Sequence, residues 1–275
     1  MYLGPHHFQV QSQTFQELIH FSTTSLWFAP YGLISCGLDQ EALQNGIISM
    51  AHARGLFPDG LAFQMPDCDP LPSRLNINEL FPTTQESLKV LLAVPQHCQN
   101  GPNCALDSES SPTQVRYKAE ECVFADENTG RDEKAIRVGK KNIRFVLETQ
   151  SQEGLVTIPV ARVIRDGNGR FIFDPSFIPP CLQISASERL LVMVKTLVDI
   201  LSEKSFSLSR ASRVTAGRAA YSTEEIASFW FVHTVNEALG VLRHLCVSDR
   251  GHPEQRGRRP DRRQRRVDRP PHRDP

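Results

Sequence analysis

Short apolar runs separated by turn-forming residues follow one another from Gln13 to Ile164. Turn signals such as Pro58-Asp59-Gly60 and Asp126 to Gly130 lie between the runs, and no long helical period separates them. This pattern favours a mainly β protein with an antiparallel β-sandwich. The predicted strands are Gly32 to Leu38, Gly46 to Met50, Leu61 to Met65, Leu88 to Val94, Ile143 to Leu147 and Leu155 to Ile164.

A β-hairpin is the clearest single element of this region. Val156, Ile158 and Val160 alternate with a second set of residues, and the chain then reaches the turn sequence Asp166 to Gly169. Phe171 to Phe173 provide the returning strand. Alternation on both sides of a glycine-containing turn predicts two paired antiparallel strands.

The apolar period changes from two to helical after Pro179-Pro180. Ser185 with Glu188, and Ser222 with Glu225, have the spacing of capping boxes, so each pair predicts the start of a helix. The apolar face of the first helix contains Leu190, Val194, Leu197 and Leu201, and that of the second contains Val232, Val235, Leu239, Leu242 and Cys246. Two such helices cannot bury both faces alone, which indicates an incomplete α-helical bundle.

The chain therefore divides into three predicted parts. Residues 1–180 form the β-sandwich, residues 181–254 form the partial helical bundle, and residues 255–275 form a disordered tail rich in arginine and proline. The segment from residue 249 onward holds ten arginines against five acidic residues, and Val267 is its only aliphatic side chain. So little apolar surface cannot offset the entropy lost on ordering.

Two interpretations of the tail remain open. Arginines neutralise phosphates, which would allow a nucleic-acid-binding arm. However, acidic residues are interspersed, and there is neither an aromatic residue for base stacking nor a lysine. Arginine, proline, glycine, aspartate and histidine together are typical of a GC-rich gene translated in the wrong frame, so we expect a frameshifted end and no nucleic-acid partner.

The cysteines and the hydropathy pattern indicate a cytoplasmic protein. Seven cysteines are an odd number without a CxxC pair, which favours neither a zinc site nor a disulfide framework. Only Cys98 and Cys104 lie close enough in sequence to raise the question of a local bond. No window approaches the roughly 18 apolar residues that a membrane span needs, so we expect no membrane insertion.

Candidate catalytic chemistry is sparse. The adjacent pair His6-His7 would diverge on a helix or a strand, which argues against a metal pair. His233 and Asn236 are three residues apart and share a helix face, where they could form hydrogen bonds across a bundle and fix its register. The sequence contains no phosphate loop, GxSxG elbow, HExxH or dinucleotide fingerprint. We therefore expect no enzyme, no catalytic or metal-binding residues and no cofactor.

Several blocks together resemble the TssK (ImpJ, VasE) family of the bacterial type VI secretion system. The opening Leu3 to Gln9, with Pro5, His7, Phe8 and Gln9, resembles the family's first motif. The further blocks are Ala53 to Gly60 with Phe57, Pro58, Asp59 and Gly60; Asp174 to Pro180 with Pro179 and Pro180; Phe229 to Asn236 with His233 and Asn236; and His252-Pro253-Glu254. The sequence departs from the family at two points. We expect the edge strand that precedes the family's opening motif to be missing here, and the likeness ends abruptly after Glu254.

The resemblance implies an adaptor with a β-sandwich shoulder, a helical neck and a head. Family members are homotrimers whose shoulders bind the baseplate wedge proteins TssF and TssG, while their heads contact TssL and TssM of the membrane complex. This chain is expected to keep the shoulder and about half of the neck and to lack the head. It would then dock on the wedge through exposed loops and the amphipathic segment His7 to Phe21.

A phage-like receptor-binding or carbohydrate-binding sandwich is the alternative function. Trp27, Phe28 and Tyr31 could form an aromatic platform for a sugar ring. The same three residues could instead pack together as a cluster on an edge strand. Binding to a glycan array that disappears in Trp27→Ala would favour the carbohydrate-binding interpretation.

Overall fold

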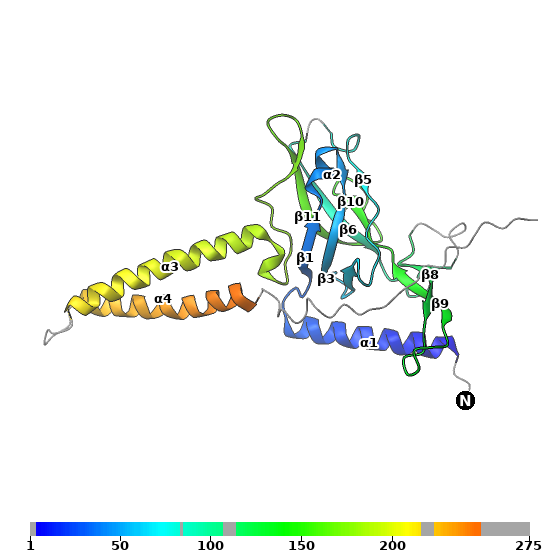
Figure 1. Cartoon of the computed structure of the whole chain (residues 1–275), viewed down its shortest axis with the longest axis horizontal. Coiled ribbons are helices and arrows are strands. Elements are labelled where there is room, and N and C mark those ends of the chain that lie inside the picture. The colour runs from blue at the N-terminus through cyan, green and yellow to red at the C-terminus, as the bar shows by residue number, and fades with distance from the viewer. Residues whose placement is uncertain (1–3, 83–84, 107–113, 216–222, 249–275) are drawn as a thin grey trace, which may run out of the picture.

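A long helix, a region of antiparallel sheets and a helical pair follow one another along the chain (Figure 1). The computed structural model describes residues 4–82, 85–106, 114–215 and 223–248. Helix α1 (Pro5–Leu26) comes first, and helices α3 (Glu188–Thr215) and α4 (Thr223–Ser248) extend away from the sheets. Over these ranges no helix combines the length and hydropathy needed to cross a membrane.

Two antiparallel sheets form the centre of the β region. The first has the strand order β1-β3-β4, and the second has the order β10-β6-β11-β12. Their strands are β1 (Gly32–Leu38), β3 (Met50–Leu56), β4 (Ala62–Met65), β6 (Ser87–Pro95), β10 (Arg144–Leu147), β11 (Leu155–Arg165) and β12 (Phe171–Phe173). Helix α2 (Gln40–Gln44) follows β1, and the short strands β2 (Ile47–Ile48) and β5 (Leu75–Asn76) pair with each other.

One hydrophobic core joins the two sheets. Leu33 and Phe63 from the first sheet and Leu92 and Ile158 from the second are buried in the same cluster. Strand β6 lies between β10 and β11, and successive residues from Val90 to Pro95 are buried. Because both faces of the strand are covered there, it reads as a continuous apolar run rather than an alternating one.

The predicted hairpin is confirmed as β11–β12. Val163 pairs with Phe173, and Arg165 pairs with Phe171. In the turn, one carboxylate oxygen of Asp166 accepts hydrogen bonds from the backbone N–H groups of Asn168 and Arg170. An aspartate that satisfies its own turn in this way explains why the turn forms at this point of the sequence.

A second hairpin was not predicted as strands. It consists of β8 (Tyr117–Phe124) and β9 (Lys134–Lys141), with β7 (Cys104–Ala105) parallel to β8. The predicted turn at Asp126 joins β8 to β9, and hydrogen bonds from the N–H groups of Thr129 and Asn128 lower the pKa of the Asp126 carboxyl. Most side chains of β9 are exposed, so this strand lacks the apolar run used to find the others.

The description of the fold as mainly β was wrong. Helices α1, α3 and α4 contain 22, 28 and 26 residues, so helix and strand contents are roughly balanced. The largest omission was α1 as a helix, because most of its polar positions are glutamine, serine, threonine or histidine, and Glu17 is its only acidic residue, whereas a solvated helix face is usually rich in charge.

The two C-terminal helices pack antiparallel along the predicted face of α4. Val235 and Leu239 are buried, and Val232, Leu242 and Cys246 are half-buried. On α3 the predicted face is only partly covered, since Leu197 is 47% exposed. Large apolar side chains that remain exposed on the pair include Val192, Ile200, Phe206, Phe229, Trp230, Phe231 and Val241. Two helices alone therefore do not bury their apolar surface.

Helix α3 begins later than the first predicted capping box. Ser185 lies inside a 3₁₀ turn (Ile184–Ala186), and α3 starts at Glu188. The hydroxyl of Ser187 accepts a hydrogen bond from the N–H of Leu190, so Ser187 provides the capping oxygen. The second predicted box, Ser222 with Glu225, lies outside the described side chains.

Backbone hydrogen bonds join β1 to the segment that connects the sheets with the helices. The N–H of Leu33 donates to the carbonyl of Pro180, and the N–H of Leu182 donates to the carbonyl of Leu33, both over 2.8 Å. Gly32 has a φ of +144°, and a Cβ there would lie 2.9 Å from the backbone of Pro180. Only glycine fits this close approach without strain.

Gly32→Ala is therefore expected to lower the free energy of unfolding by more than ~1 kcal/mol, because the added Cβ meets backbone that cannot move aside. Gly240→Ala is the matched control. Gly240 lies in the interior of α4 with open space around its Cβ position, so alanine should stabilise the helix by up to ~1 kcal/mol. Urea unfolding of both variants measures the difference, and equal unfolding midpoints would contradict the prediction.

Candidate interaction surfaces

The opening-motif residues form the start of α1. Pro5 occupies the first turn, where its missing N–H costs nothing. The N–H of Gly4 donates to Nδ1 of His7 over 3.1 Å, and the N–H of His7 donates back to the carbonyl of Gly4. Phe8 and Gln9 are exposed beyond this cap. The motif thus specifies where the helix begins and leaves an aromatic side chain on its surface.

The second motif forms the tight turn between β3 and β4. Phe57 is fully buried and packs on Phe63, with the ring centroids 4.9 Å apart. Pro58 follows on the surface, and one carboxylate oxygen of Asp59 accepts a hydrogen bond from the N–H of Leu61. Gly60 has a φ of +82°, and a Cβ there would lie 2.5 Å from the ring of His20 in α1. The turn is therefore also the place where α1 approaches the sheets.

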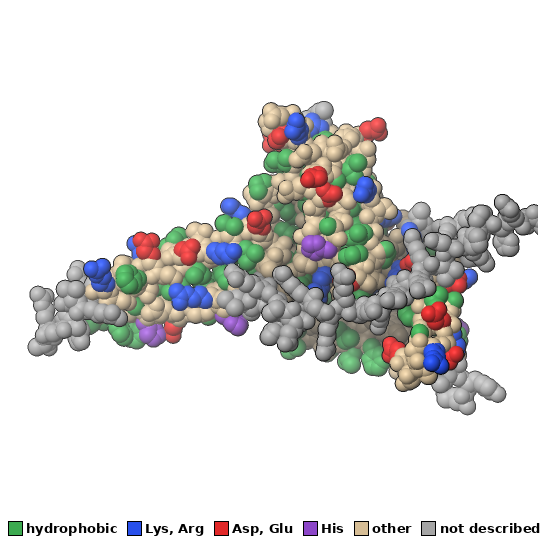
Figure 2. Space-filling view, in the orientation of Figure 1, with side chains coloured by type: hydrophobic (Ala, Val, Ile, Leu, Met, Phe, Trp, Pro, Cys, Tyr) green, Lys and Arg blue, Asp and Glu red, His purple; other side chains and the backbone are tan. Residues whose placement is uncertain are grey.

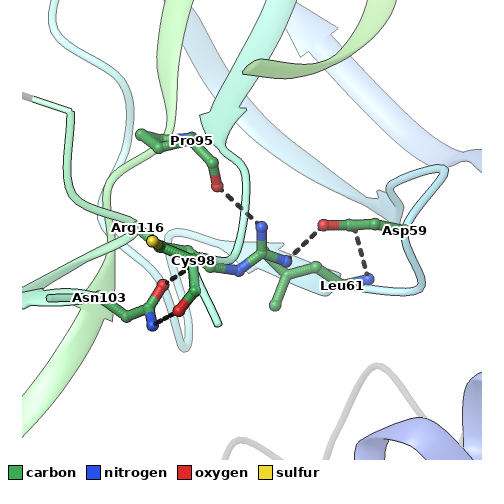
Figure 3. Close-up of polar contacts among 6 residues, drawn as sticks. All are labelled: Asp59, Leu61, Pro95, Cys98, Asn103 and Arg116. Atoms are coloured by element: carbon green, nitrogen blue, oxygen red, sulfur yellow. Dashed lines mark hydrogen bonds and ion pairs between the residues drawn. The ribbon is translucent and has the colours of Figure 1, made fainter. Parts of the chain in front are cut away.

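A buried arginine ties this turn to the second sheet (Figure 3). Arg116 places one guanidinium nitrogen 2.6 Å from the carboxylate of Asp59 and donates from another to the carbonyl of Pro95 at the end of β6. The Arg116 side chain is only 6% exposed, compared with 28% for Asp59. Three segments far apart in sequence are thereby held by one side chain.

Sequence reasoning missed Arg116, because its partner lies 57 residues away and no local motif marks it. The neighbouring loop is closed by Asn103, whose amide exchanges hydrogen bonds with the backbone of Cys98 (Figure 3). Cys98 and Cys104, the one local cysteine pair considered, are both free thiols.

The third motif leads from β12 toward the helices. The Nε of Arg162 lies 2.7 Å from the carboxylate of Asp174, and the guanidinium stacks over the ring of Phe177 at 5.4 Å. The hydroxyl of Ser176 also donates to Asp174, and this hydrogen bond together with the charge of Arg162 lowers the pKa of the carboxyl. The motif ends at Pro179-Pro180, next to β1.

The two residues singled out on α4 have different surroundings. Asn236 crosses to α3, where its amide oxygen accepts a 2.6 Å hydrogen bond from the hydroxyl of Ser205. His233 contacts its own helix, with Nδ1 3.7 Å from the carboxylate of Glu237 and its ring 5.8 Å from that of Trp230. Only Asn236 makes the expected cross-helix bond, and its role in fixing the register stays a prediction.

A cavity of about 680 Å³ separates α1 from the β region. The wall from α1 includes Gln13, Glu17 and His20, and the opposite wall includes Asp59 and Arg116. Apart from the bordering Ile19, the side chains that α1 turns toward the sheets are polar, and no residue of α1 is buried. Helix α1 therefore approaches the β region near His20 and does not contribute to the core.

Metal and redox sites find little support in the described part of the chain. It contains no group of three or more histidine, cysteine or acidic side chains placed to hold a metal ion. Desolvation, with a smaller effect of Cys181, raises the pKa of the Cys36 thiol to about 12, so this thiol stays protonated. The arginine-rich tail lies outside the described residues.

The three aromatic residues of the carbohydrate alternative do not share one environment. Trp27 and Phe28 follow the end of α1 and are exposed, whereas Tyr31 packs against the core. The edge-strand cluster considered for them is wrong, because Trp27 and Phe28 lie between α1 and β1 rather than on a strand.

Comparison with known proteins identifies relatives over almost the whole chain. The family model described as bacterial type VI secretion, VC_A0110, EvfL, ImpJ, VasE matches residues 7–256. A Pseudomonas aeruginosa protein, the type VI secretion system baseplate component TssK1, is 28% identical over 260 residues, which cover 93% of this chain and 56% of the relative. The chain thus spans about half the length of this curated relative.

Solved structures with related folds include assembled and isolated proteins. The baseplate complex from the type VI secretion system contains a chain with a TM-score of 0.79 and 26% identity, covering 90% of this chain and 55% of that chain. A crystal structure of TssK has a TM-score of 0.77 at 24% identity, with 93% and 56% covered. The cryo-electron microscopy structure of the TssK-TssF-TssG subcomplex has a TM-score of 0.78 at 24% identity, with 90% and 77% covered.

The family match begins at His7, just after Pro5, and ends two residues beyond Glu254, where the sequence likeness was expected to stop. It includes the turn at Phe57 to Gly60, the passage at Pro179-Pro180 and the α4 residues His233 and Asn236. The chain therefore belongs to the TssK (ImpJ, VasE) family of bacterial type VI secretion proteins, which is structural rather than enzymatic.

Proposed function

We propose that this chain is a structural adaptor of the type VI secretion baseplate that binds the wedge proteins TssF and TssG in the cytoplasm. Residues 1–180 would form a sandwich shoulder, and residues 181–254 would form part of a neck shared within a homotrimer. The family match over residues 7–256 carries the proposal. Similarity in fold to the TssK chain of the TssK-TssF-TssG subcomplex supports it.

The surface chemistry fits an assembly protein. Monomeric soluble proteins rarely expose large contiguous apolar patches, and such patches mark interaction sites. Here the helical pair exposes Phe206, Phe229 and Trp230, and α1 exposes Phe15 and Leu18. The β region, by contrast, has a closed core whose motif turns are held by internal ion pairs. A folded domain that carries exposed loops is suited to binding. We expect these loops to make the contacts with the wedge.

Size-exclusion chromatography of the full chain with TssF and TssG from the same bacterium tests this function. We expect one complex that contains all three proteins at physiological salt. A variant that ends at Glu254 is the matched control, because it removes the arginine-rich residues and with them nonspecific binding by charge. The variant should bind as well as the full chain does.

Failure of the full chain to bind TssF and TssG would contradict the proposal. Loss of binding in the variant ending at Glu254 would assign the interaction to the tail instead. The expected contacts with TssL and TssM, which the family resemblance assigns to a head, stay a prediction. Retention of TssL and TssM as strong as that of the wedge would show that the head is not needed for them.

A further inference from the structure

Asparagine is followed directly by glycine at three places in the sequence, Asn45-Gly46, Asn100-Gly101 and Asn168-Gly169. Such pairs are prone to spontaneous deamidation, in which the backbone nitrogen of the glycine attacks the side-chain carbonyl carbon of the asparagine. Glycine favours the attack because it has no Cβ to hinder the approach. In a folded protein, the rate therefore depends on how firmly the structure holds that nitrogen.

Two of the three glycine nitrogens are held by hydrogen bonds. The N–H of Gly46 donates to the carbonyl of Leu43 over 2.8 Å, and the carbonyl of Gly46 accepts from the N–H of Ile77. The N–H of Gly169 donates to the carbonyl of Asp166 over 2.9 Å. Both glycines have a positive φ, +74° for Gly46 and +77° for Gly169, so both are fixed parts of their turns. Attack by either nitrogen requires its hydrogen bond to break and its turn to open.

The pair Asn100-Gly101 has different surroundings. Both residues are exposed in the loop between β6 and β7. Among the residues that the structure describes, neither the N–H of Gly101 nor the side-chain amide of Asn100 has a hydrogen-bond partner. The carbonyl of Gly101 accepts a bond of 3.4 Å from the amide of Asn103, which leaves the Gly101 nitrogen unrestrained. Gly101 also lies outside the left-handed region that the other two glycines occupy.

We propose that Asn100 is a site of spontaneous deamidation in the folded chain, whereas Asn45 and Asn168 are protected. The Gly101 nitrogen forms a bond to Cγ of Asn100, and the side-chain nitrogen leaves as ammonia with the proton that the Gly101 nitrogen gives up. One water then opens the succinimide ring, so that its hydroxyl stays on a carbonyl carbon and its other proton returns to the Gly101 nitrogen. Opening at Cγ gives aspartate, and opening at the main-chain carbonyl carbon of Asn100 gives isoaspartate.

The products change a loop that the structure otherwise closes with care for its length. The amide of Asn103 exchanges hydrogen bonds of 2.8 and 2.6 Å with the backbone of Cys98, and the carbonyl of Asn103 accepts from the N–H of Tyr117 at the start of β8. Isoaspartate inserts one extra main-chain atom between Cys98 and Asn103, and both products add a negative charge. The loop borders the β8–β9 hairpin, over which Figure 2 shows acidic and basic side chains together.

Peptide mass spectrometry of the full chain, kept at physiological temperature in mildly alkaline buffer made with heavy-oxygen water, tests the proposal. The peptide that contains Asn100 should take up labelled oxygen at least ~10-fold faster than those that contain Asn45 or Asn168, because one hydrogen bond and an ordered turn oppose the reaction at the other two. The same chain unfolded in urea is the matched control, and the three rates should converge there. Asn100→Gln should take up much less label at this position, because the longer side chain closes a larger ring slowly.

Three results would overturn the proposal. Asn45 or Asn168 could react as fast as Asn100 in the folded chain, or the folded chain could leave Asn100 unlabelled while the unfolded chain labels it. A preference for Asn100 that persists in urea would assign the selectivity to neighbouring residues in the sequence rather than to the fold. The proposal does not depend on the wedge function, which co-elution of the fresh chain with TssF and TssG measures separately.

Discussion

Asp59→Ala is expected to lower the free energy of unfolding by about 3–5 kcal/mol, because it leaves a buried guanidinium without its counter-charge. Arg116 is almost fully enclosed, and its remaining bond to the carbonyl of Pro95 cannot compensate for the lost charge. The turn between β3 and β4 also loses the carboxylate that accepts from the N–H of Leu61. Urea unfolding followed by tryptophan fluorescence and circular dichroism measures the change.

Two further variants test whether the loss of stability comes from the unpaired buried charge of Arg116. Arg116→Leu in the Asp59→Ala background removes the unpaired charge, so the double variant should be more stable than Asp59→Ala alone. Lys89→Ala is the control for an exposed ion pair, since Lys89 and Glu148 are 48% and 32% exposed, and it should cost no more than ~1 kcal/mol. A loss for Asp59→Ala no larger than that for Lys89→Ala would show that the buried pair does not hold the turn.

Phe57→Ala is expected to destabilise the chain by a similar amount, about 3–5 kcal/mol, for an unrelated reason. The Phe57 ring is fully buried against Phe63 in the core, so alanine leaves a cavity that the surrounding strands fill only in part. Because small domains are stable by only about 5–15 kcal/mol, this change would unfold a substantial fraction of the protein near physiological temperature.

Phe8→Ala is the matched control for Phe57→Ala. Both phenylalanines belong to family motifs, but the Phe8 side chain is 56% exposed. Its removal should change the unfolding midpoint of the β region little, because the ring is largely in solvent. Equal losses of stability in Phe8→Ala and Phe57→Ala would contradict the burial that distinguishes them.

The sheet core could be predicted from the sequence wherever burial leaves an apolar run. Strand β6 reads as Leu88 to Val94 because both of its faces are covered, and β11–β12 reads as a hairpin because its turn carries Asp166 and Gly169. Strand β9 escaped detection because its side chains stay in solvent. The segment His7 to Phe21 was recognised as amphipathic but not as part of a helix, because most polar positions of α1 are uncharged and Glu17 is its only acidic residue.

The contacts of the motif turns could not be predicted in the same way. The sequence from Phe57 to Gly60 predicts a turn. No neighbouring residue predicts that Arg116 binds this turn. Likewise, Asp174 marks the passage toward the helices without revealing its partner Arg162. Ion pairs between distant segments depend on how sheets stack, and no local period encodes that. The start of α3 was misplaced by two residues because Ser185 and Ser187 both stand where a cap could form.

The two backbone hydrogen bonds between β1 and the segment after Pro180 have a mechanical consequence. A force on the α3–α4 pair is transmitted through these bonds to β1, an edge strand of the first sheet. The helical pair is therefore joined to the sheet by hydrogen bonds at Leu33 as well as by the covalent chain. A force at the far end of the helices would act on β1 as shear, close to the turn that the ion pair of Asp59 and Arg116 stabilises.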